Sequence, residues 1–266
     1  MESKMLKKIF AAVLTVFLVT TAWAETAEEK GYRIAKEAGS QGDGYVDSVS
    51  KMKMILINKK GQETVREMKS KDIEGTDTTG AKGLTVFLTP KDQKGTALLN
   101  HAHSDKADDQ WLYLPALKRV KKIASKNKSG PFLGSEFSFE DLGGAGGLDK
   151  KTYKWIKDEV LNGRDCYVLE AYPKDKNSGY TKQVSWIDKE DFRAYKVEYY
   201  DRKHSHLKTM TITEYEKHND KWWRPGNMYM VNHQTHKKTR ILFSETKFGV
   251  GLTAKQFTKN SLSRAR

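Results

Sequence analysis

The sequence has few cysteines and few long apolar runs, and each scarcity excludes a class of protein. Among 266 residues there is one cysteine, and there is one long apolar run, at the N-terminus. A single cysteine cannot form an internal disulfide, so a small disulfide-stapled fold is excluded. A single apolar run excludes a protein with several transmembrane helices. Aromatic residues make up 11% of the chain, enough to build a core, which argues against a wholly disordered protein.

The N-terminal apolar run has the features of an export signal. Lys4, Lys7 and Lys8 precede the apolar residues 9–19, and residues 22–24 (AWA) supply the small residues at which a signal peptide is cut. The run is shorter than the roughly 20 residues that span a bilayer. We therefore predict that residues 1–24 form a removable signal peptide, that residues 25–266 form a single domain, and that the protein is periplasmic.

Apolar residues follow a helical period only at residues 26–39, where Thr26 is the expected N-cap. Beyond that segment they alternate with period two, and turn signals such as Asn162-Gly163 separate short β-branched or aromatic stretches. Without crossover helices between them, these strands must be antiparallel. The predicted strands are residues 48–58, 63–73, 83–90, 96–103, 110–115, 118–124, 152–162, 165–172, 182–188, 194–201, 207–216, 222–232 and 239–248.

One face of the predicted sheet is wet, because Lys51 and Lys53 alternate with Met52 and Met54. Residues 125–149 interrupt the strands with an amphipathic stretch that ends in GGAGG. The sequence therefore predicts a mainly β fold, an incomplete (half-open) antiparallel β-barrel or strongly curved sheet. We expect the N-terminal helix and the 125–149 insert to cover its concave side, with the insert as a helical lid.

Two segments of this sequence are characteristic of a known family. Residues 111–123 (WLYLPALKRVKKI) and 134–142 (GSEFSFEDL) resemble the outer-membrane lipoprotein-sorting protein family, the LolA-like periplasmic carriers, in its branch associated with RND-type transporters. Residues 166–174, 196–201 and 223–230 agree with it as well. The resemblance implies a LolA/LolB-like half-barrel with a lid and an apolar cavity for acyl chains. It also implies a carrier without catalytic residues or cofactors.

A carrier of acyl chains needs a large, apolar and adaptable lining, which methionine and aromatic side chains provide. Alternate positions on neighbouring predicted strands would place such residues on one inner face. The alternative is that each of them fills an ordinary core. The expected lining residues are Met52, Met54, Leu56, Leu84, Val86, Leu88, Trp111, Tyr113, Trp155, Tyr199, Met228 and Met230.

The insert has the composition of a lid, because apolar side chains precede a glycine-rich hinge. Acidic and basic residues near it could form a latch or a docking rim; the alternative is an ordinary loop with solvated charges. The expected lid residues are Phe132, Leu133, Phe137, Phe139 and Leu142. The expected latch or docking residues are Arg119, Lys121, Lys122, Glu140 and Asp141.

Motifs that would indicate an enzyme or a metal site are weak. The pairs His101/His103 and His204/His206 lie on one face of a strand each, but no further ligand is placed by spacing, so we predict no metal site. Neither a phosphate-binding loop nor a nucleophile elbow is present in the sequence. We therefore predict a protein that is not an enzyme, and we expect Cys166 to be a buried core residue.

The chain has a formal charge of +14, and six of its basic residues form a dense cluster beside Trp111 and Tyr113. Export makes nucleic acid an improbable partner, so anionic lipid head groups or a membrane transporter are the expected ones. We predict a monomeric carrier that takes a lipid or lipidated cargo from an inner-membrane RND-type transporter toward the outer membrane. The alternatives are an envelope accessory protein that docks through its basic face without a lipid ligand, and a hydrolase with an unrecognised site. The basic residues are Lys118, Arg119, Lys121, Lys122, Lys126 and Lys128.

Overall fold

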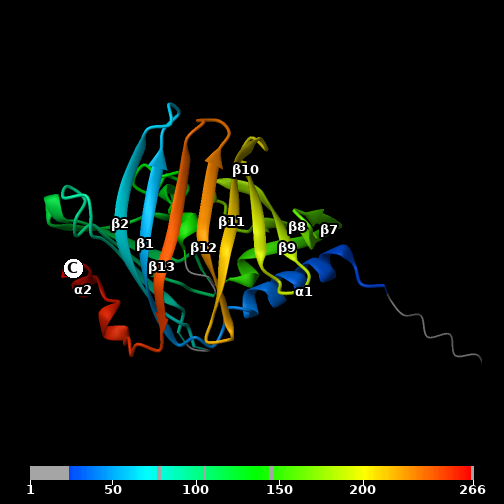
Figure 1. Ribbon diagram of the computed structural model, residues 1–266, viewed down its shortest axis with the longest axis horizontal. Helices are drawn as coiled ribbons and strands as arrows, with labels where there is room; N and C mark the ends of the chain where they lie inside the picture. Colours follow the sequence, from blue (N-terminus) through cyan, green and yellow to red (C-terminus); the bar gives the residue numbers. More distant parts are fainter. Residues whose placement is uncertain (1–23, 77–78, 105, 144–146, 265–266) are drawn as a thin grey trace, which may run out of the picture.

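Thirteen antiparallel strands form one sheet in the computed structural model, which describes residues 24–76, 79–104, 106–143 and 147–264 (Figure 1). The predicted signal peptide lies outside these residues except for its last position. Each of the thirteen predicted strands is confirmed, with ends that differ by a few residues. The strands are β1 (Asp47–Ile57), β2 (Glu63–Ile73), β3 (Lys82–Phe87), β4 (Ala97–His101), β5 (Asp109–Leu114), β6 (Arg119–Lys122), β7 (Lys151–Leu161), β8 (Arg164–Pro173), β9 (Tyr180–Asp188), β10 (Ala194–Asp201), β11 (His206–His218), β12 (Trp222–Asn232) and β13 (Lys238–Phe248).

The sheet consists of two meanders, which are joined where the first strand, β1, pairs with the last strand, β13. Its order is β6-β5-β4-β3-β2-β1-β13-β12-β11-β10-β9-β8-β7, so β6 and β7 are the two edges and the sheet stays open. Asn162 and Gly163 link β7 to β8 with positive φ angles of 51° and 81°, as a tight hairpin turn requires. The expected half-open, strongly curved antiparallel sheet is confirmed.

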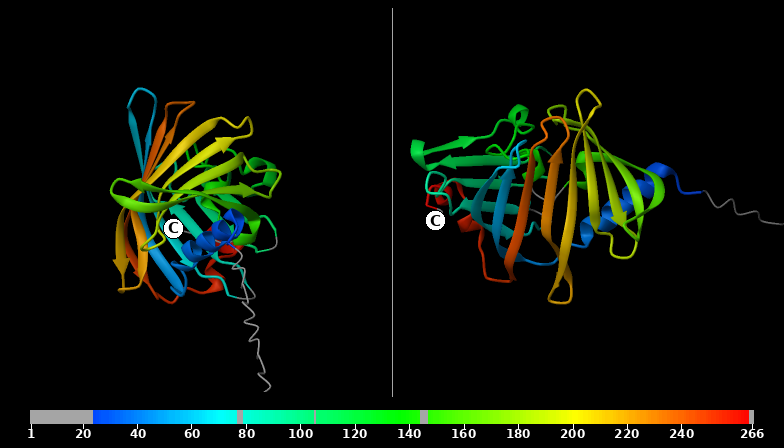
Figure 2. Two further views of the ribbon diagram at one scale, coloured as in Figure 1. Left: turned by 90° about the vertical axis from the view of Figure 1, so that its right-hand side faces the viewer. Right: turned by 45° about the horizontal axis from the view of Figure 1, so that its top comes forward.

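Helix α1 (Ala27–Ser40) packs on one end of the concave side, against β7 and β8 (Figure 2). Thr26 and Glu29 form a reciprocal capping box at its start, as the sequence indicates. Gly31 lets the helix approach the sheet closely, because a Cβ there would lie 2.7 Å from the backbone nitrogen of Trp155. Ile34 of the helix is fully buried against Leu169 and Ile187.

Two further segments cover the other end of the sheet, one on each face. The insert (residues 125–149) lies on the concave face, and its described residues form turns of 3-10 helix rather than an α-helix: η2 (Ser125–Asn127), η3 (Glu140–Leu142) and η4 (Leu148–Lys150). The C-terminal segment (residues 252–264) lies on the convex face and contains η5 (Ala254–Gln256) and α2 (Lys259–Leu262). No helix in the described part of the chain is long and apolar enough to cross a membrane.

Candidate functional site

The concave face carries one continuous apolar surface, here called the concave cluster. It extends from β5 through the central strands to β10, and the strand register aligns its members across the sheet, for example Met52 with Met68 and Met228 with Ile241. The sheet residues at its centre are Met54, Met68, Phe87, Leu98, Leu112, Tyr199, Met210, Ile212, Met230 and Ile241. All six methionines between residues 6 and 266 belong to it or pack against it. This face is therefore both apolar and adaptable in shape.

The insert covers the concave cluster with its own aromatic side chains. Phe132 and Phe137 are 1% and 3% exposed, and the Phe132 ring lies 5.8 Å from that of Phe87 and 5.4 Å from that of Phe139. Leu133 and Leu142 pack against the same cluster. All five residues predicted for the lid therefore contact the apolar face.

Side chains of the sheet hold the backbone of the insert through hydrogen bonds to its carbonyl groups. Arg66 Nη1 donates to the carbonyl of Leu133 over 2.7 Å, and Asn100 Nδ2 donates to that of Leu142 over 2.7 Å. Gln110, which is fully buried, donates from Nε2 to the carbonyl of Phe139 over 2.8 Å. These bonds satisfy buried carbonyls of an irregular segment that has few partners of its own.

A buried ion pair fixes the end of the insert to the sheet. Lys208 Nζ lies 2.6 Å from Asp141 Oδ2, and the two side chains are 3% and 4% exposed. The hydroxyl of Tyr180 donates to the other oxygen of Asp141 over 2.8 Å. Burial, and then the charge of Asp141, raises the pKa of Tyr180 well above its usual value, so this phenol remains a donor. We call Asp141, Lys208 and Tyr180 the latch.

Glu140 binds a different part of the sheet. Its carboxylate accepts hydrogen bonds from the Ser178 hydroxyl and the Gly179 backbone amide, each over 2.8 Å. Burial raises the pKa of Glu140, although both of these bonds act in the opposite direction. Together with the latch, this contact joins the insert to the beginning of β9.

The predicted partners of these two acids are not the observed ones. Arg119 and Lys121 are exposed on the edge strand β6, and Lys122 forms an ion pair with Asp109 instead, over 2.6 Å. The sequence does contain a signal for the true partner. Lys208 has the same strand parity as Met210 and Ile212, so it is a lysine placed within an apolar alternation.

The predicted lining residues do not share one face. Met52, Met54, Leu56, Tyr199, Met228 and Met230 lie in or against the concave cluster. Trp155 packs instead with α1, and Leu88 lies just beyond β3, outside these clusters. Leu84, Val86, Trp111 and Tyr113 lie on the opposite face, in the convex cluster that Phe257 and Leu262 of the C-terminal segment complete.

The expectation of a common inner face is therefore wrong for this last group, and the register gives the reason. Met68 pairs with Phe87, so Phe87 faces the insert, whereas Val86 faces the other way. Strands β3 to β5 are buried on both faces, so their apolar residues occupy both parities. An alternating pattern cannot then indicate which face is which.

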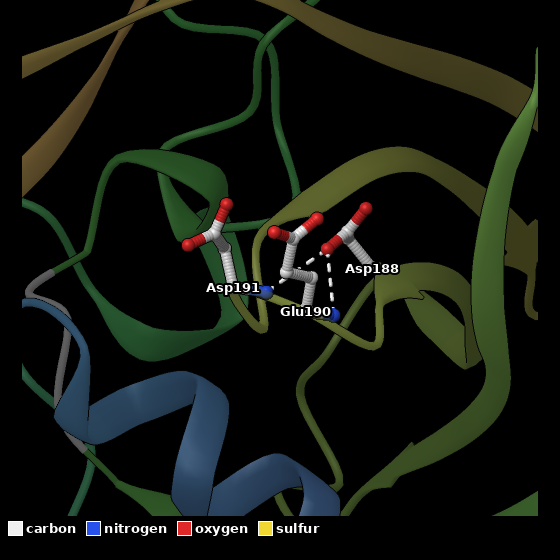
Figure 3. Close-up of side chains that lie close together, drawn as sticks. All are labelled: Asp188, Glu190 and Asp191. Atoms are coloured by element: carbon white, nitrogen blue, oxygen red, sulfur yellow. Dashed lines mark hydrogen bonds between the residues drawn. The ribbon is translucent and has the colours of Figure 1, made fainter.

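One histidine pair and one group of acids are the remaining candidates for a metal site. His101 Nε2 lies 2.7 Å from the carbonyl of Phe257, and His103 Nε2 lies 3.0 Å from Asp109, so both have structural partners. Among the described residues, Asp188, Glu190 and Asp191 are the three acids close enough together to share a cation (Figure 3). Asp188 accepts hydrogen bonds from the backbone amides of the other two, each over 2.9 Å, which is how an aspartate caps a turn.

Cys166, expected in the core, is a free thiol and is fully buried. It packs against Val168, Val184 and Trp186 on the convex side of β8 and β9. Burial raises the pKa of this thiol, which keeps it protonated and unreactive.

Comparison with known proteins connects this arrangement to a family. A family model described as "uncharacterized protein" matches residues 79–264. A crystal structure from Vibrio parahaemolyticus, designated an outer membrane lipoprotein-sorting protein domain, is 51% identical over 89% of this chain and 100% of its own, with a TM-score of 0.86. The chain belongs to the outer membrane lipoprotein-sorting protein family. No curated protein matches it.

Two structures with lower sequence identity are also similar to this chain. A DUF1329 family protein from Desulfovibrio piger is 28% identical, with a TM-score of 0.84, over 89% of this chain and 99% of its own. A LolA superfamily protein from Nitrosomonas europaea is 20% identical, with a TM-score of 0.70, over the same shares of the two chains. The second match shows a LolA-like fold. The two segments that carry the family resemblance are β5–β6 and the insert, next to the concave cluster.

Proposed function

We propose that this protein is a periplasmic carrier that binds a lipid or the acyl chains of a lipidated protein on the concave cluster, beneath the insert. One observation supports this most strongly: every methionine of the described chain gathers on a single face, and the described residues of the insert that covers it form neither an α-helix nor a strand paired to the sheet. Membership of a lipoprotein-sorting family is in accord with this assignment.

The insert occupies the space that an acyl chain would take. Phe132 and Phe137 fill the concave cluster in this structure, so loading requires the insert to move away and the chain to replace its aromatic rings. Burial of apolar area contributes roughly 25 cal/mol per Å² for either occupant, so an acyl chain offsets the apolar contact that the insert gives up. Such an exchange allows cargo to be taken up and released without a covalent step.

The lining residues of the proposed site are the six of the expected set that face the insert. They are Met52, Met54, Leu56, Tyr199, Met228 and Met230. The latch is a contact that opening must break, because moving the insert separates Asp141 from Lys208, and water then replaces the ion pair.

The source and destination of the cargo follow from the basic surface and the family resemblance. We propose that an inner-membrane RND-type transporter delivers the cargo and that the carrier passes it toward the outer membrane. Lys118, Arg119 and Lys121 are exposed on and beside the edge strand β6, where an acidic partner surface could reach them. The same observation supports the second candidate, an accessory protein that docks on a transporter and carries no lipid.

Lipid extraction of protein purified from the periplasm, followed by mass spectrometry, tests the carrier role. The carrier predicts co-purified lipid or lipidated protein. Met52→Trp places a large ring on the concave face and should lower the lipid content, whereas Val65→Trp, an exposed position on the opposite face of the neighbouring strand, should not. Lipid-free wild-type protein that still binds the transporter would favour the accessory role instead.

A further inference from the structure

The convex face carries a second candidate site, on the opposite face of the sheet from the insert. A cavity of about 400 Å³ lies between strands β2 and β3 and the C-terminal segment. Leu84 and Val86 of β3, both nearly buried, line its apolar side. The rest of its lining is polar and includes four cationic residues: Lys69 and Lys71 on β2, and Lys255 and Arg264 on the C-terminal segment.

The charge around this cavity is unbalanced. No acidic side chain is among its described lining residues. None of the four cations takes part in an ion pair between described residues. Lys51, the cross-strand neighbour of Lys69, is by contrast paired with Glu245 over 2.8 Å. Four like charges around one hollow repel one another, so an anion placed among them is stabilised by all four.

A neutral group on the same wall lacks a partner. The side-chain oxygen of Gln256 is buried without a hydrogen bond. A buried unpaired amide oxygen costs free energy unless a donor reaches it. The oxygen itself has almost no accessible surface, so the Gln256 side chain must turn toward the cavity before its oxygen can accept from a ligand hydroxyl or its N–H groups can donate to an anionic oxygen.

We propose that this cavity binds a phosphate group, either of a soluble phosphate ester or of a phospholipid head group. Lysine and arginine side chains are the usual donors to phosphate oxygens, and their hydrogen bonds to it are charge-assisted. Leu84 and Val86 give the adjoining carbon atoms of an ester an apolar surface to lie on. This site goes beyond the proposed carrier function, because it lies on the opposite face of the sheet and needs no movement of the insert.

Binding measurements with defined probes test the proposal. The purified protein is titrated with inorganic phosphate and with glycerol 3-phosphate by calorimetry. It is then sedimented with vesicles of phosphatidylcholine alone and with vesicles that also contain phosphatidylglycerol. The test variant is Lys69→Gln/Lys71→Gln. Its control is Lys59→Gln/Lys60→Gln, which removes the same charge from the exposed turn between β1 and β2.

We expect saturable binding that the test variant weakens by about tenfold or more, since each basic residue near an anionic surface contributes on the order of 1 kcal/mol. The control should change it less than about twofold, because the turn is remote from the cavity. Binding of the soluble probes identifies a phosphate ester as the ligand, and binding of the phosphatidylglycerol vesicles alone identifies a head group. Equal losses in test and control variants, or no saturable binding of any probe, would overturn the site.

Discussion

The two faces of the sheet are covered in different ways. On the concave face, the insert lies on a surface that contains six methionines, and a buried ion pair and hydrogen bonds to its carbonyls hold it. On the convex face, the C-terminal segment places Phe257 and Leu262 into a cluster of leucine, valine, alanine and tryptophan without methionine.

This difference indicates which of the two segments, the insert or the C-terminal segment, can move away from the sheet. A methionine surface can repack around a different occupant, and polar bonds can be exchanged for water. Phe257 and Leu262 are at most 1% exposed. If the C-terminal segment moved away, their removal would leave a cavity in the closely packed convex cluster. We therefore expect the concave cover to exchange with cargo and the convex cover to stay in place.

Breaking the latch should have the largest effect on stability. Lys208→Met leaves the Asp141 carboxylate buried without its cation and should lower the free energy of unfolding by about 3–5 kcal/mol. Replacing both residues, Lys208→Met/Asp141→Leu, should recover most of that loss. Urea denaturation measures both values.

The control for the latch is Lys182→Met, which removes the half-buried convex partner of Glu170 and should cost less than about 1 kcal/mol. Equal losses for Lys182→Met and Lys208→Met would show that the insert is not held by a buried pair.

Truncating the convex cover should destabilise the protein without changing its cargo. Leu262→Ala should lower the free energy of unfolding by about 2–4 kcal/mol, because the fully buried side chain leaves a cavity. The lipid content per folded molecule should stay the same. Leu142→Ala, a partly buried position on the insert, should cost less and should change the lipid content. The reverse pattern would place the exchangeable cover on the convex face.

Replacing methionines of the concave cluster with leucine should change the free energy of unfolding very little. Met52→Leu and Met228→Leu conserve volume, so each should cost less than about 1.5 kcal/mol. A branched leucine repacks less freely than a thioether, so the range of acyl-chain lengths that mass spectrometry finds bound should narrow. Leu99→Met in the convex cluster is the matched control and should not alter that range. A range that is unchanged in the Met→Leu variants would argue against a methionine-lined site.

The insert should also make a smaller, pH-dependent contribution to stability through Glu140. Because burial raises the pKa of Glu140 in the folded state, the folded protein binds this proton more strongly than the unfolded chain does. Its contribution to stability is therefore present at low pH and is lost as pH rises through the folded-state pKa. Glu140→Gln should flatten that decline in a series of urea transitions at increasing pH. Parallel profiles for mutant and wild type would contradict the assignment.

The sequence was sufficient to predict the strands and the open curved sheet. Period-two alternation is a local property, and each turn signal, such as Asn162-Gly163, acts within a few residues. The insert was predicted as a cover because its apolar side chains precede a glycine-rich stretch between the predicted strands. Its five apolar contacts are confirmed.

The latch and the assignment of faces could not be predicted in the same way. Asp141 and Lys208 are 67 residues apart in sequence, and their contact depends on the path of the insert over the sheet. Leu84 and Val86 were assigned to the wrong face because strands buried on both sides lose the polar parity that identifies the core. In both cases the deciding interaction is long-range: the alternation on β11 places Lys208 on the apolar face, but it does not identify Asp141 as its partner.

Photo-crosslinking with a lipid that carries a diazirine on its acyl chain tests the central claim most directly. The purified protein is loaded with this lipid and irradiated, and the modified peptides are identified by mass spectrometry. The account predicts adducts on the peptides that contain Met52, Met54, Met228 and Met230, together with Phe132 and Phe137 of the insert. Adducts confined to the convex peptides around Leu84, Val86 and Trp111 would contradict it.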